Sequence, residues 1–170
     1  MNGSSELGRY ERATARGIEL RSAAPPPSPP MAAGYIQHAM TERENGRFAE
    51  AMVYLTLAAE NSRYAVHALR QRAEIEESLG HLDDAITSLK DALHLSVGED
   101  RTSWALYRSL GDVYLRRGEP EEAAYYFRRA LKLAPHDDGL EARLARCSRQ
   151  AIGSDDLVTS RVTTRFDAVY

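Results

Sequence analysis

The chain has 170 residues, 43% of them hydrophobic, and a formal net charge of −3. This predicts one domain with a real core and argues against nucleic-acid binding, since proteins that bind nucleic acids usually carry a basic surface. No stretch approaches the roughly 20 consecutive apolar residues of a membrane helix. The single cysteine, Cys147, excludes an internal disulfide and a cysteine-based zinc cluster. From these features together we expect a cytoplasmic protein without direct membrane insertion.

Residues 1–30 are predicted to be a disordered N-terminal tail that ends in a proline-rich linker. Pro25–Pro30 holds five prolines and one serine, a composition typical of a stiff, extended segment that cannot join a helix. The apolar residues of 5–22 form a poor helical stripe, so that segment either stays disordered or folds on a partner.

An internal repeat organises residues 31–137. Gly46, Gly80 and Gly118 are spaced by 34 and then 38 residues, and alanines follow each glycine at two fixed offsets: Ala51, Ala85 and Ala123, then Ala58, Ala92 and Ala130. A period of this length indicates stacked units of two helices each. We predict three such units, at about 32–65, 66–99 and 104–137.

The third unit shows the pattern most clearly. Apolar residues of its first helix recur at three- and four-residue steps, which places them on one face. Gly118 is predicted to end that helix in a left-handed conformation, and Pro120 suits the first turn of the next. Gly111 on the first helix and Ala123 and Ala130 on the second present little volume, so the two helices can cross closely.

These residues resemble the tetratricopeptide repeat. Nine positions of the third unit agree with the family pattern: Tyr107, Leu110, Gly111, Tyr114, Gly118, Ala123, Phe127, Ala130 and Pro135. The first two units match less completely; His38 and Arg72 stand where the family has leucine. The resemblance implies an all-α solenoid of three antiparallel helical hairpins whose function is to bind another protein.

Residues 138–152 are predicted to form a capping helix. Asp138 with Glu141 three residues later is typical of a capping box, and Leu140, Leu144 and Cys147 line one face. This face is expected to cover the third hairpin, as terminal caps do in solenoids. Residues 153–170 are predicted to be a flexible C-terminal tail. Val158–Tyr170 has apolar residues at helical steps, which suggests an interaction segment or self-association through the groove.

The resemblance also places a peptide-binding groove on the first helices of the hairpins. Its expected contact residues are Ile36, Met40, Arg43, His67, Arg70, Glu74, Arg108, Asp112 and Leu115. Such a groove would hold an extended or helical peptide, and its arginines would grip a carboxylate through two hydrogen bonds. The alternative is that the pairs Arg70/Glu74 and Arg108/Asp112, each four residues apart, are simply ion pairs within one helix.

Some relatives in this family hold the C-terminal carboxylate of heat-shock chaperones with lysine, asparagine and arginine. The matching positions here are Ile36, Met40, Gln71, Ala105 and Ser109. None of these residues supplies the clamp, so we predict that the chain does not bind acidic tails of that kind.

No catalytic motif is present: the sequence lacks a GxGxxG, a P-loop, an HExxH and a GxSxG. We predict no enzyme activity, no catalytic or metal-binding residues and no cofactor. The five histidines are scattered and are interpreted as structural or solvated, and Cys147 as a small apolar residue under the cap. Of the adjacent Tyr125 and Tyr126, only one can face the hairpin core, and the other is expected to pack on a neighbouring helix.

Three functional hypotheses follow from this pattern. The first is an adaptor or scaffold that binds a partner segment in its groove within a larger assembly. The second is a small cargo chaperone resembling those that guard type III secretion translocators. The third is a fixed structural subunit of a multiprotein complex.

Overall fold

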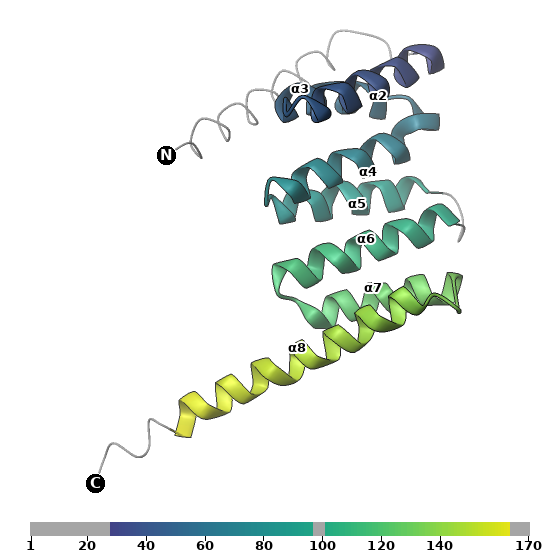
Figure 1. Cartoon of the computed structure of the whole chain (residues 1–170). Coiled ribbons are helices and arrows are strands. Elements are labelled where there is room, and N and C mark those ends of the chain that lie inside the picture. Colours follow the sequence, from purple (N-terminus) through teal and green to yellow (C-terminus); the bar gives the residue numbers. More distant parts are fainter. Residues whose placement is uncertain (1–27, 97–100, 164–170) are drawn as a thin grey trace, which may run out of the picture. The chain divides into compact units, whose positions relative to one another are not determined.

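The computed structural model describes residues 28–96 and 101–163, with side chains as far as Ala151. Within these ranges the chain forms seven α-helices and no strand (Figure 1), which confirms the prediction of an all-α fold of helical hairpins with a C-terminal capping helix. The helices fall into two compact units that divide between Val97 and Gly98, and we describe each unit by itself.

The first unit contains two hairpins. The first is formed by α2 (Pro29–Glu44) and α3 (Phe48–Ala59), and the second by α4 (Ser62–Ser78) and α5 (Leu82–Leu95). The hairpins join where α3 packs against α4, and α2 also contacts α4. As a result, the first helices of both hairpins lie side by side (Figure 1).

The second unit contains the third hairpin and the cap. It consists of α6 (Arg101–Arg117), α7 (Pro120–Leu133) and α8 (Asp138–Thr163). The hairpin is formed by α6 and α7, and α8 packs on α7. Leu140 and Cys147 of α8 are buried, at 0% and 2% exposed, as the predicted apolar face of the cap requires.

Two predicted boundaries are wrong. The linker was expected to remain extended through Pro30, but α2 begins at Pro29 with Ser28 at its N-cap. Proline is tolerated there because the first turn of a helix has no use for its missing N–H. The last helix, α8, ends at Thr163 and so continues beyond the predicted end at 152. A lone glycine such as Gly153 weakens a helix by about 1 kcal/mol without breaking it. Predictions on 1–27 and 164–170 concern residues outside the described ranges.

The three glycine turns confirm the alignment of the repeats. Gly46, Gly80 and Gly118 have φ values of 72°, 80° and 87°, in the left-handed region that favours glycine. The residue after each glycine donates its N–H to a carbonyl five residues earlier, as in Glu119 to Tyr114 at 3.0 Å. This is the Schellman motif, and it ends the first helix of each hairpin at the same place.

The close crossing of α6 and α7 depends on Gly111. A Cβ atom at this position would lie 2.4 Å from the ring of Phe127, whose side chain is fully buried. Such an approach is far inside van der Waals contact, so the third hairpin requires glycine here, as predicted.

Candidate functional site

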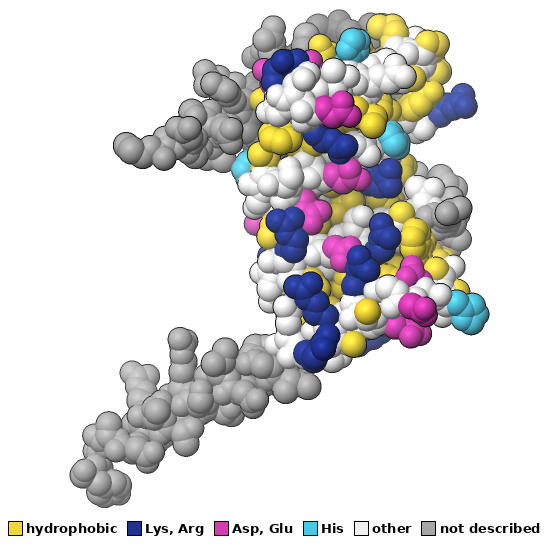
Figure 2. Space-filling view, in the orientation of Figure 1, with side chains coloured by type: hydrophobic (Ala, Val, Ile, Leu, Met, Phe, Trp, Pro, Cys, Tyr) yellow, Lys and Arg dark blue, Asp and Glu magenta, His cyan; other side chains and the backbone are white. Residues whose placement is uncertain are grey.

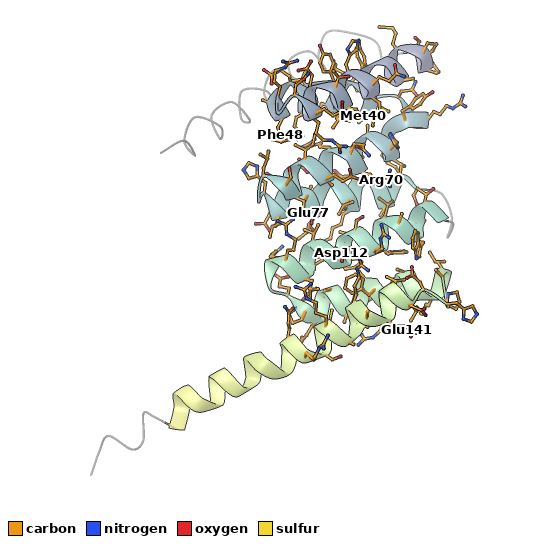
Figure 3. The ribbon with its side chains drawn as sticks, viewed as in Figure 1. Met40, Phe48, Arg70, Glu77, Asp112 and Glu141 are labelled. Carbon is orange, nitrogen blue, oxygen red and sulfur yellow. The ribbon has the colours of Figure 1, made fainter. Side chains whose placement is uncertain are left out.

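The first unit presents a surface formed by the neighbouring helices α2 and α4. We call it the α2/α4 surface and define it by Met40, Arg43, His67, Arg70 and Glu74. Met40 projects from α2 and Arg70 from α4 (Figure 3). Met40 is 39% exposed, so it offers an apolar contact on this surface.

Ile36, which was predicted to belong to this surface, is buried instead. It is 7% exposed and lies in the core cluster with Ala39, Leu55 and Ala68. Its apolar side chain packs where α2, α3 and α4 meet, so it supports the surface and does not offer a contact. The prediction of Ile36 as a groove residue is therefore wrong.

Arg43 connects the two helices of the surface. Its Nη1 atom donates to Gln71 Oε1 and to Glu74 Oε2, each at 3.1 Å. Glu74 therefore pairs with the preceding hairpin, whereas the sequence suggested a pair with Arg70 on its own helix. Arg70 itself has no hydrogen bond or ion pair with any described residue. The surface thus holds two guanidinium groups and one carboxylate.

His67 adds a neutral ring to this surface. Burial, together with the nearby charge of Arg70, lowers the pKa of the imidazole below its usual value, while Glu74 has a smaller opposing effect. At pH 7 the ring is therefore uncharged. Figure 2 shows basic and acidic side chains interspersed over this face of the molecule, so the excess positive charge at Arg70 is local.

The second unit carries the remaining predicted groove residues on α6. Asp112 Oδ1 accepts a hydrogen bond from Arg143 Nε of α8 at 2.8 Å, and Arg143 also donates to the carbonyl of Gly139. The predicted pair of Arg108 with Asp112 is therefore not formed. Instead, the guanidinium of Arg108 lies 5.0 Å from the ring centroid of Trp104, in the geometry of a cation–π contact.

Leu115 is 7% exposed, so its assignment as a groove contact is wrong. Asp112, about one third exposed, is engaged by the capping helix. Sequence reasoning missed Gln71 and Arg143, both of which reach across 28 to 31 residues of chain to their partners. No periodicity within one helix reports such contacts.

Four tyrosine rings of α6 and α7 contact one another in the third hairpin. Tyr126 stacks on Tyr107 and Tyr114, with ring centroids 6.5 and 5.3 Å away, so this member of the tyrosine pair faces the hairpin. Tyr125 is 50% exposed. It meets Tyr126 edge to face and accepts a hydrogen bond from Arg129, whereas we expected it to pack on a neighbouring helix.

No metal site or membrane helix is found in the part of the chain that the structure describes. There, no three side chains among histidine, cysteine, aspartate and glutamate form a group able to hold a metal ion, and no helix is long and apolar enough to span a bilayer. Burial raises the pKa of the Cys147 thiol, which keeps the sulfur protonated and unreactive at neutral pH.

Comparisons with known proteins agree with this geometry. A family model described as tetratricopeptide repeat matches residues 71–138. PcrH from Pseudomonas aeruginosa is similar in structure (TM-score 0.56, 16% identity), with 73% of this chain and 91% of that chain covered. A chain of a T3SS complex from Aeromonas hydrophila is also similar (TM-score 0.57, 17% identity), with 91% of this chain and 99% of that chain covered. MamA is similar too (TM-score 0.53, 16% identity), with 92% of this chain and 94% of that chain covered. At these identities the likeness is one of fold. No curated protein sequence matches the chain.

Proposed function

We propose that the chain is an adaptor that binds a segment of a partner protein on its α2/α4 surface, because residues 71–138 match a tetratricopeptide repeat model and the fold resembles such proteins. The observation that carries this proposal is Arg70, a cation without a described ion-pair partner, on the helix next to the one that exposes Met40. A segment with one apolar and one acidic side chain would complement that arrangement.

The Arg43–Glu74 pair supports the proposal because it can exchange partners at little cost. The two side chains are 34% and 45% exposed, and ion pairs at such positions contribute between about 0 and 1 kcal/mol. An incoming carboxylate can therefore bind Arg70 directly, and it can also compete with Glu74 for Arg43. Two planar guanidinium groups are well suited to carboxylates because each presents two parallel N–H donors.

The same surface lacks the features of a clamp for heat-shock chaperone tails. Of the five positions that carry the clamp in relatives, Ile36 is buried, Gln71 is 9% exposed and engaged by Arg43, and Met40 is apolar. The partner is therefore proposed to be of another kind, and titration with an acidic C-terminal peptide of such a chaperone should give no micromolar binding.

The test is an affinity pull-down with the full chain, comparing Arg70→Glu with a matched control, Arg63→Glu. Arg63 is exposed in the first turn of the same helix and lies outside the surface. The proposal expects specific partners to be lost with Arg70→Glu and retained with Arg63→Glu. Equal recovery by both variants would assign binding to another part of the chain.

A cargo chaperone is a second candidate because α2 exposes two methionines, Met31 at 53% and Met40 at 39%. Flexible thioether side chains adapt to varied apolar segments. A chaperone would keep an otherwise insoluble partner in solution on co-expression, and the effect should weaken with Met40→Glu. An adaptor would bind a partner that is soluble by itself.

A further inference from the structure

Arg108 of α6 carries a positive charge that no carboxylate of the described residues neutralises. It makes no hydrogen bond or ion pair with any of them. The only acidic residue of α6 is Asp112, one helical turn further on, and Arg143 of α8 engages its carboxylate at 2.8 Å. The second unit therefore holds a guanidinium group whose nearest acid on the same helix is already paired with the capping helix.

Trp104 holds this guanidinium group in place. Cζ of Arg108 lies 5.0 Å from the ring centroid of Trp104, one turn earlier on α6. A guanidinium group makes such a contact with its face, so the N–H groups in its plane stay available for hydrogen bonds. Because the contact restricts the side chain before any ligand arrives, binding loses less conformational entropy than at a freely moving arginine.

The accessible atoms of Arg108 are its two terminal nitrogens. Nε is shielded from solvent and has no acceptor, whereas Nη1 and Nη2, which also lack an acceptor, are not shielded. Together they present two N–H donors along one edge of the guanidinium plane, a spacing that matches the two oxygens of a carboxylate. One guanidinium group compensates one negative charge. A phosphate dianion would keep a second charge, and phosphorylated side chains are bound by arginine clusters.

We propose that Arg108, stacked on Trp104, binds the carboxylate of an aspartate or glutamate side chain from a partner segment, and that the capping helix keeps this site open. Asp112 lies four residues after Arg108, at the spacing of an ion pair within one helix. Arg143 holds Asp112 away from that pairing, so the cap controls whether Arg108 is free. The site belongs to the second unit and does not depend on the α2/α4 surface.

The experiment titrates the full chain with a blocked tripeptide, Ala-Glu-Ala, at constant ionic strength and follows the fluorescence of Trp104. Because Trp104 is the only tryptophan and touches the proposed site, its emission reports binding there. The expected result is a saturable change with a dissociation constant on the order of millimolar for so small a ligand. The matched peptide Ala-Gln-Ala, which lacks the charge, should give no saturable change. Equal responses to the two peptides would overturn the proposal.

Two further ligands test the choice of a carboxylate side chain. Inorganic phosphate, and a tripeptide of alanine whose carboxylate is at its C-terminus, should both bind more weakly than Ala-Glu-Ala. On α6, Ala105 and Ser109 stand where relatives hold a chain terminus, so Arg108 lacks the help that such a ligand needs. Tighter binding of either ligand would contradict the assignment of an acidic side chain.

Variants test the residues and the role of the cap. Arg108→Gln should weaken binding of Ala-Glu-Ala by roughly tenfold or more, whereas Arg149→Gln, which removes the same charge at an exposed position of α8, should not. Arg143→Ala should weaken binding about twofold by releasing Asp112, and adding Asp112→Asn should restore it. Binding that survives Arg108→Gln would refute the site. A loss in Arg143→Ala that Asp112→Asn does not repair would refute the control by the cap.

Discussion

Gly111→Ala tests the packing that defines the third hairpin. The added Cβ would lie 2.4, 2.6 and 2.8 Å from three ring atoms of Phe127. Because that ring is 0% exposed, it cannot yield without displacing other core side chains. Overpacking of this kind costs typically about 1–3 kcal/mol and occasionally more. Replacing a helical glycine by alanine otherwise gains about 1 kcal/mol, so we expect a net destabilisation of about 1 kcal/mol.

The assay is urea denaturation followed by fluorescence. Trp104 is the only tryptophan and lies on α6, so its emission reports the unit that contains Gly111. The matched control is Gly34→Ala, because Gly34 is also helical but its added Cβ would meet nothing within 4 Å. Followed by circular dichroism, this variant should be unchanged or more stable by up to about 1 kcal/mol.

The reasoning also predicts a rescue. Phe127→Leu removes the ring that the new methyl group meets, so the double variant should lose less stability than the sum of the two single variants. A Gly111→Ala protein as stable as the parent would refute the claim that close helix crossing requires glycine here.

Three other predictions concern charges. The pKa of His67 is lowered in the folded chain, so the unfolded chain takes up the proton at a higher pH than the folded chain does. The free energy of unfolding that His67 contributes should therefore be fully present above pH 6.5. It should decline as the pH falls through that value towards the folded pKa. An NMR titration of the ring should give a midpoint below 6.5 that rises in Arg70→Ala. Glu76→Gln should lower the free energy of unfolding by about 3 kcal/mol, since it breaks the buried ion pair with Arg72. Urea denaturation followed by circular dichroism measures this change. An unchanged midpoint would contradict a stabilising role of the pair. Arg143→Ala should loosen α8 by less than about 1 kcal/mol and increase the labelling rate of Cys147 by a thiol reagent several-fold, whereas Arg146→Ala should not.

Much of the fold was predictable because it depends on residue patterns that are local in the sequence. The glycine turns at Gly46, Gly80 and Gly118 are needed for a left-handed conformation, which few other residues adopt. Gly111 is needed for a close crossing with Phe127. Each constraint acts within one hairpin of about 34 residues, so the spacing of small residues along the chain indicates the architecture directly.

The candidate site was less predictable because its contacts are between helices. Glu74 and Asp112 each have an arginine four residues earlier, but both pair with arginines about 30 residues away. Which distant arginine reaches each carboxylate depends on how the helices pack against one another. The helical periodicity of the sequence carries no information about that packing.

The most direct test of the central claim is site-specific photocrosslinking from the α2/α4 surface. A photoreactive p-benzoylphenylalanine at position 40 should capture a discrete partner protein, and the capture should disappear when Arg70→Glu is added. The same group at the exposed position of Glu50 on α3 should capture nothing comparable. Capture from position 50 but not from position 40, or capture from position 40 that is unaffected by Arg70→Glu, would contradict the assignment of this surface as the binding site.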